Sequence, residues 1–117
     1  MAEAQFPYDA DDPSGVPCNP PHTHVATIND WEFVGSAAGV PSVQAIKQAI
    51  YQGGPAPAAI CAKAALQGYS GGVFDTNESC APYAVNHAVL LVGWDDSQGP
   101  NGVWIMRNSW SAAWGEG

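Results

Sequence analysis

Positive charge is scarce in this chain of 117 residues. Only Lys47, Lys63 and Arg107 oppose eleven Asp and Glu residues, which gives a formal net charge of -8 at pH 7. A surface of that sign repels the phosphates of nucleic acids and the headgroups of anionic lipids. The composition therefore argues against nucleic acid and membrane as partners.

The chain also lacks two kinds of hydrophobic segment. No apolar run approaches the roughly 20 residues of a membrane-spanning helix. The start, MAEAQFPYD, has neither the basic segment nor the apolar segment of a signal peptide. We therefore expect a chain that either follows a removed leader or is a piece of a longer protein.

Paired metal-binding motifs are missing as well. Cys18, Cys61 and Cys80 do not have the C-x-x-C spacing of a zinc site. His22 and His24 lie near Cys18, but a fourth ligand is lacking. The acidic residues Asp9, Asp11 and Asp12 do not have the spacing of a calcium loop and fit a solvated turn. The sequence predicts no metal and no cofactor.

What is present favours one domain, residues 1–117, with strands, loops and a single helix. Hydrophobic residues make up 46% of the chain, with 13 glycines and 10 prolines. A helix is predicted over 43–52, after Pro41-Ser42 and before Gly53-Gly54. Strands are predicted over 24–28, 31–34, 55–61, 88–94 and 103–108, those at 55–61 and 88–94 being buried. This order indicates an α+β fold with antiparallel strands.

One histidine and one asparagine stand at the ends of two neighbouring predicted strands. A hairpin can bring His87 and Asn108 to the same end of a sheet. The asparagine carbonyl would then accept the imidazole N–H and orient the ring towards a nucleophile. Trp110 and Trp114 would exclude water from that hydrogen bond, whereas Trp94 and Trp104 are better explained as core.

Three motifs in this region resemble the C-terminal half of papain-like cysteine peptidases: NHAVLLVGW, WIMRNSW and WGEG. FPYD, GGPAPAAI and YSGGVF resemble the same half in the same order, so that the resemblance covers nearly the whole chain. It implies a barrel-like antiparallel sheet with one helix, incomplete here at both ends. One departure is Ser111, which stands where the family usually has glycine after N-S-W.

The resemblance also implies roles for single residues. His87 matches the imidazolium partner of the catalytic thiolate, and Asn108 matches the asparagine that orients it. Trp110 matches the indole that shields their hydrogen bond, and Trp114 matches a wall on the leaving-group side of the cleft. Residues flanking the histidine match positions where the substrate lies; these are Val85, Asn86 and Ala88.

The nucleophile of the family is a cysteine in its other, largely helical half, and that signature is absent from this sequence. Cys18 matches a half-cystine whose partner belongs to the other half. We expect Cys61 to pair with Cys80 in a disulfide, and no cysteine here to act as nucleophile. Disulfide chemistry suggests an oxidising compartment: secreted, periplasmic or lysosome-like.

These expectations lead to competing functional hypotheses. The first is the C-terminal portion of a peptidase that hydrolyses peptide bonds through an acyl-thioester, with peptides as substrates and the missing N-terminal half as partner. The isolated chain would then be inactive. The alternatives are a non-enzymatic peptide-binding module or pseudo-peptidase, one chain of a split enzyme, or a truncated piece that exposes its docking surface.

Overall fold

The computed structural model describes residues 26–37, 39–81 and 84–116. The chain divides into two compact units, Met1–Glu32 and Phe33–Gly117. In the first unit the described residues, 26–32, form neither helix nor strand. The candidate ligands discussed above lie outside the described residues; these are Asp9, Asp11, Asp12, Cys18, His22 and His24.

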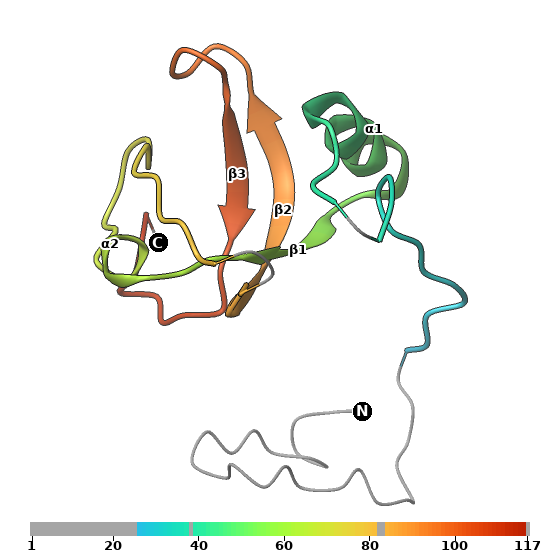
Figure 1. Cartoon of the computed structure of the whole chain (residues 1–117), viewed down its shortest axis with the longest axis horizontal. Coiled ribbons are helices and arrows are strands. Elements are labelled where there is room, and N and C mark those ends of the chain that lie inside the picture. Colours follow the sequence, from blue (N-terminus) through green and yellow to red (C-terminus); the bar gives the residue numbers. More distant parts are fainter. Residues whose placement is uncertain (1–25, 38, 82–83, 117) are drawn as a thin grey trace, which may run out of the picture. The chain divides into compact units, whose positions relative to one another are not determined.

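The second unit contains two helices and a three-stranded sheet (Figure 1). The order along the chain is α1 (Val43–Gly53), β1 (Ala56–Ile60), α2 (Ala64–Gln67), β2 (His87–Asp95) and β3 (Val103–Arg107). The strands lie in the order β1-β2-β3 and both pairs are antiparallel. The predicted mixture of helix and antiparallel sheet is confirmed. Among the described residues the sheet is open, so the barrel-like closure is not confirmed.

Helix α1 begins and ends where local chemistry directs. The Ser42 hydroxyl accepts the backbone N–H of Ala45 at 3.2 Å, and Ser42 itself is extended. At the other end Gly54 has φ 87°, a conformation that favours glycine, and its N–H donates to the Ile50 carbonyl. The predicted helix is therefore confirmed to within one residue.

Contacts on one side of the helix hold α1 against the sheet. Ile50 is its buried residue, and Figure 1 shows the helix beside β1 and β2. Lys47 forms an ion pair with Asp96, just after β2, and its ammonium lies 5.7 Å from the centre of the Trp94 ring. Apolar burial and one cation thus position α1.

Two strands predicted before α1 are wrong. Residues 26–28 and 31–34 form no strand, while 24–25 lie outside the described residues. Alternating apolar residues need a partner strand and a covered face before they form a stable ladder. Here the side chain of Ile28 is 83% exposed and that of Trp31 is 69% exposed.

The sheet is also less buried than its composition predicts. Buried apolar residues among those described are Ile50, Ala62, Leu66 and Val89. Strand β2 has one buried residue in nine, and β1 alternates between half-buried and exposed positions. The expectation of fully buried strands is therefore wrong for the described structure.

A β-bulge interrupts the pairing of β2 with β3. Gly93 pairs with Ile105, but Leu91 pairs with Met106, so that Val92 is an extra residue on β2. Beyond the bulge Leu90 pairs with Arg107. No helix in the described part of the chain has the length and apolar character needed to cross a membrane.

Candidate active site

The predicted histidine–asparagine pair is present at one end of the β2–β3 hairpin. His87 Nε2 lies 2.8 Å from Asn108 Oδ1. His87 opens β2, and Asn108 follows the last residue of β3. Because Leu90 pairs with Arg107, the same register continued by one residue places Asn108 opposite Val89, two positions from His87.

The bulge determines which face of the sheet Asn108 shares. Residues opposite one another in an antiparallel pair point to the same face, and a shift by one residue moves a side chain to the other face. If the register set near the turn continued through Val92 without a bulge, Asn108 would lie opposite Leu90. The bulge therefore brings Asn108 to the face that carries Val89 and His87.

The direction of the hydrogen bond follows from a second donor. The backbone N–H of Ser109 donates to Asn108 Oδ1 at 2.8 Å, which identifies that atom as the oxygen. An amide oxygen only accepts, so the proton must be on His87 Nε2. The other ring nitrogen, Nδ1, then remains for a different partner, as a base when neutral and as a donor when protonated.

The amide nitrogen of Asn108, unlike its oxygen, makes no hydrogen bond with the described residues. Nδ2 is buried and has no hydrogen-bond partner within the described part of the chain. A buried amide without a partner costs about 1–3 kcal/mol.

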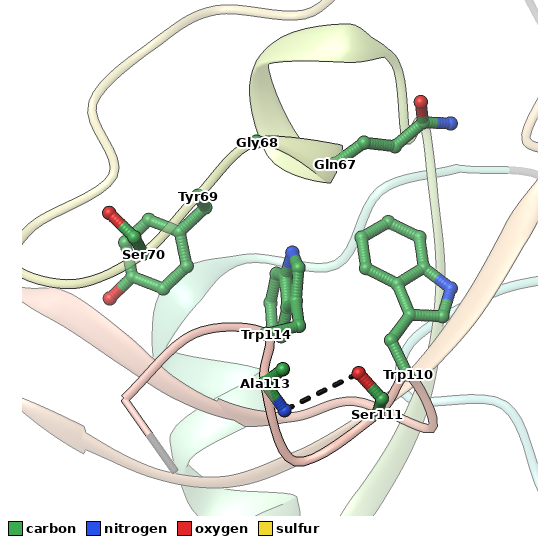
Figure 2. Close-up of a pocket in the computed structure, with 8 residues that line it drawn as sticks. All are labelled: Gln67, Gly68, Tyr69, Ser70, Trp110, Ser111, Ala113 and Trp114. Atoms are coloured by element: carbon green, nitrogen blue, oxygen red, sulfur yellow. Dashed lines mark hydrogen bonds between the residues drawn. The ribbon is translucent and has the colours of Figure 1, made fainter.

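A row of aromatic rings covers the histidine. Trp110 stacks on His87 with ring centres 4.7 Å apart and an interplanar angle of 28°. Trp114 meets Trp110 edge-on at 5.0 Å and 90°. Figure 2 shows the Trp114 indole standing between the rings of Tyr69 and Trp110.

These rings border a shallow open depression of about 550 Å³. It is lined by Gln67, Gly68, Tyr69, Ser70, Trp110, Ser111, Ala113 and Trp114 (Figure 2). Ser111, the departure from the usual glycine, shapes the turn before Trp114. Its hydroxyl accepts the N–H of Ala113 at 3.3 Å, and its carbonyl accepts the N–H of Trp114 at 3.0 Å.

The opposite wall is tied to the C-terminal segment by polar contacts. Tyr69 donates its hydroxyl to the Gly72 carbonyl at 2.6 Å, and Glu116 accepts the Gly72 N–H at 2.8 Å. Partial burial, followed by the negative charge of Glu116, raises the pKa of Tyr69 above its ordinary value. Tyr69 therefore stays a neutral donor at physiological pH.

The three residues predicted to contact substrate flank His87 with different surroundings. Val85 and Ala88 are exposed, the first by 55%. Asn86 uses both ends of its side-chain amide on the backbone of Ala62: Oδ1 accepts the N–H at 2.8 Å and Nδ2 donates to the carbonyl at 2.9 Å. Its side chain thus fixes the chain next to His87, and substrate contact by these residues stays a prediction.

The predicted disulfide between Cys61 and Cys80 is confirmed, with Cα atoms 5.7 Å apart. Two residues before Cys80, the Glu78 carboxylate accepts backbone N–H groups from Lys63, Ala65 and Leu66 at 3.0, 2.9 and 3.2 Å. Sequence reasoning missed both α2 and Glu78. One helical turn is too short to give a periodic pattern, and its capping residue lies 12–15 positions away.

Comparison with known proteins places this geometry in context. The family model described as papain family cysteine protease matches residues 1–117. Cathepsin J of Rattus norvegicus is 37% identical over 119 residues, covering 97% of this chain and 33% of that protein. Digestive cysteine proteinase 2 of Homarus americanus is 34% identical over 123 residues, with coverage of 97% and 33%.

A shorter alignment is more similar. Cathepsin K of Mus musculus is 42% identical over 77 residues, covering 65% of this chain and 23% of that protein. The chain thus spans about a third or less of the length of these curated relatives. No solved structure matches the chain.

Proposed function

Because the chain belongs to the papain family of cysteine proteases, we propose that the protein containing it hydrolyses peptide bonds through an acyl-thioester intermediate. The observation that carries this proposal is the hydrogen bond from His87 Nε2 to Asn108 Oδ1, which leaves Nδ1 for a thiol. The thiol would come from a cysteine elsewhere in the whole protein.

In this reaction His87 moves protons at Nδ1. The cysteine thiolate attacks the peptide carbonyl carbon, and the His87 imidazolium gives its Nδ1 proton to the leaving amine. Neutral His87 then takes a proton from water, whose oxygen attacks the thioester; the C–S bond breaks, the acid is released, and the thiolate and the His87 imidazolium are restored. Asn108 holds the ring in one orientation through both steps.

The aromatic residues serve the same steps by excluding water. Trp110 covers the imidazole, so the hydrogen bond to Asn108 operates at a lower dielectric. Trp114 borders the depression on the leaving-group side, and Val85, Asn86 and Ala88 line the substrate backbone. By itself the chain would be inactive, because a base without a positioned nucleophile and oxyanion hole gives little catalysis.

The test uses the protein translated from the complete reading frame that encodes this chain. The reading frame is first searched upstream for a helix start of the Q-x-G-x-C-W kind, and the protein is then assayed with a fluorogenic peptide amide. Loss of the imidazole in His87→Ala is expected to lower kcat/KM about 100- to 10,000-fold. Asn108→Ala is expected to lower it about fivefold, the value of one hydrogen bond of about 1 kcal/mol.

The matched control is Asn101→Ala, an exposed asparagine in the turn after β2, which is expected to leave kcat/KM unchanged. A cysteine-bearing protein that hydrolyses no peptide amide would contradict the proposal. A reading frame without such a cysteine would leave a peptide-binding module, a pseudo-peptidase or one chain of a split enzyme.

The compartment belongs to the same proposal. Persistent disulfides form in oxidising environments, so the Cys61–Cys80 bond supports a secreted, periplasmic or lysosome-like location. Proteins and peptides would be the substrates, and the segment that carries the nucleophile would be the partner of the sheet.

A further inference from the structure

We propose that Glu78 is a positioning residue for the catalytic histidine, acting through α2, Trp114 and Trp110. This inference rests on the proposed function for its catalytic meaning, but the contacts that carry it belong to the described chain. Among the described residues, the Glu78 carboxylate joins the loop before Cys80 to the start of α2 by accepting three backbone N–H groups, and the Lys63 ammonium adds a hydrogen bond to the Ser79 carbonyl.

Helix α2 depends on Glu78 for its existence. It has four residues, and the residue before it, Lys63, makes no side-chain capping bond. So short a helix cannot offset the cost of its own nucleation, and its first N–H groups need external acceptors. The Glu78 carboxylate supplies two oxygens to three of these N–H groups.

Leu66 carries the connection across α2. Its N–H donates to Glu78 at 3.2 Å, and its carbonyl accepts the indole N–H of Trp114 at 2.9 Å. Its side chain is 5% exposed, so the residue is also held by apolar packing. A second hydrogen bond connects the segment after α2 to the C-terminal segment: the carbonyl of Tyr69 accepts the N–H of Gly115 at 3.3 Å.

From Trp114 the path reaches the imidazole in two ring contacts. Trp114 meets Trp110 edge-on, and Trp110 stacks on His87. If α2 loses its first turn, the Leu66 carbonyl no longer fixes the Trp114 indole. Trp110 then loses the ring that holds it against His87, and the imidazole gains rotational freedom.

The loop that carries Glu78 is itself held in place by the nearby disulfide. Cys80 is bonded to Cys61, which immediately precedes Ala62, and Ala62 is clamped by the Asn86 amide next to His87. The loop that carries Glu78 is therefore tied to the same short segment that leads into α2. Glu78 and α2 cannot separate freely while these bonds are intact.

The test compares Glu78→Ala and Glu78→Gln in the 117-residue chain by NMR. The matched control is Asp75→Asn, an exposed carboxylate in the same loop with no hydrogen bond or ion pair to the described residues. In Glu78→Ala the hydrogen-exchange protection of the Trp114 indole N–H is expected to fall at least about tenfold, and the Nε2–H tautomer of His87 to lose population. Glu78→Gln keeps one acceptor oxygen and is expected to lie between Glu78→Ala and the parent chain.

A purely local role for Glu78 gives a different pattern. The amides of Ala65 and Leu66 would then lose protection in Glu78→Ala while the Trp114 indole and the His87 ring stayed unchanged, and that result would overturn the proposal. Equal loss throughout the β2 and β3 amides would indicate general unfolding and would overturn it too. These readouts need no peptidase activity, so they can fail or succeed independently of the proposed reaction.

Discussion

A single oxygen atom accounts for the orientation of the histidine. Asn108 Oδ1 accepts from the Ser109 backbone and from His87 Nε2. The first donor fixes the amide, and the fixed amide selects the tautomer of the ring. The chemistry available to the site, a free Nδ1, is thus decided by one backbone N–H.

Removing that oxygen is expected to release the tautomer. In Asn108→Ala, loss of a hydrogen bond worth about 1 kcal/mol lowers the ratio of the Nε2–H to the Nδ1–H form about fivefold. The ¹⁵N chemical shifts of the His87 ring report this ratio, with Asn101→Ala as the control. A tautomer ratio unchanged in Asn108→Ala would show that another group orients the ring.

Glu78 gives the structure a dependence on acid. Partial desolvation raises the pKa of Glu78, but the backbone N–H groups of Lys63, Ala65 and Leu66, with the Lys63 charge, outweigh it and lower that pKa below its ordinary value. A carboxylate whose pKa is lower in the folded state stabilises that state above its unfolded pKa, and the effect is lost as pH falls through the folded pKa.

We therefore expect the amides of Ala65 and Leu66 in α2 to lose hydrogen-exchange protection as the pH falls through the lowered pKa of Glu78, with the amides of the sheet less affected. Glu78→Gln cannot titrate and is expected to show the same low protection at neutral and acidic pH. If the protection of these amides in the parent chain does not change as the pH is lowered until the chain unfolds, the role assigned to the carboxylate is wrong.

Residue types and spacing predicted this pair because its geometry is local to one hairpin. His87 and Asn108 follow from two adjacent strands. The pairing of Cys61 with Cys80 was expected once the family resemblance had matched Cys18 to a half-cystine with its partner elsewhere. The roles of Glu78 and Asn86 could not be predicted in this way. Each uses a side chain on backbone groups of a distant loop, and no periodicity marks such a contact.

At the scale of elements, the bulge in β2 sets the face on which Asn108 lies. Deleting Val92, which is 39% exposed, leaves Gly93 paired with Ile105 and Leu91 with Met106. We expect this deletion to preserve the His87–Asn108 bond. Deleting Met106 instead moves Asn108 opposite Leu90, on the other face, and is expected to abolish the bond.

The same NMR measurement of the His87 tautomer distinguishes the two deletions, since both shorten the hairpin by one apolar residue. Retention of the Nε2–H form without Val92 and its loss without Met106 is the expected pair of results. Equal loss in both chains would mean that strand length, not register, controls the site.

Helices and strands could be predicted where neighbouring residues mark their ends. Helix α1 carries its own boundaries, Ser42 before it and Gly54 after it. The strands predicted over residues 26–28 and 31–34 failed because apolar alternation alone provides no partner strand. Helix α2 was missed because one helical turn gives no periodic pattern and its first N–H groups bond to the distant Glu78 carboxylate.

At the scale of the whole molecule, the second unit leaves large apolar side chains exposed on α1, just before α1 and on the sheet. Val40 is 95% exposed, Tyr51 84%, Val43 55% and Ile105 50%. Apolar residues in such number favour association. The chain spans about a third of the length of these relatives. In the whole protein, the proposed partner segment would cover part of this exposed apolar surface.

The isolated chain is therefore expected to associate as its concentration rises. Sizing by light scattering across a concentration series would detect a growing mean mass, and addition of the nucleophile-bearing segment would suppress it. A clean monomer at every concentration would count against an incomplete sheet. The barrel-like closure was expected from the family resemblance alone and stays a prediction, because the described strands form an open three-stranded sheet.

The bond between His87 and Asn108 closes only 21 residues of chain. Loop closure over so short a distance costs little, and contacts between neighbours in sequence form early in folding. The hairpin is thus expected to fix its imidazole before distant segments dock, which pulse-labelled exchange of the β2 and β3 amides would follow. In the order of assembly, the proposed base would take its final orientation before the segment that carries the proposed nucleophile docks.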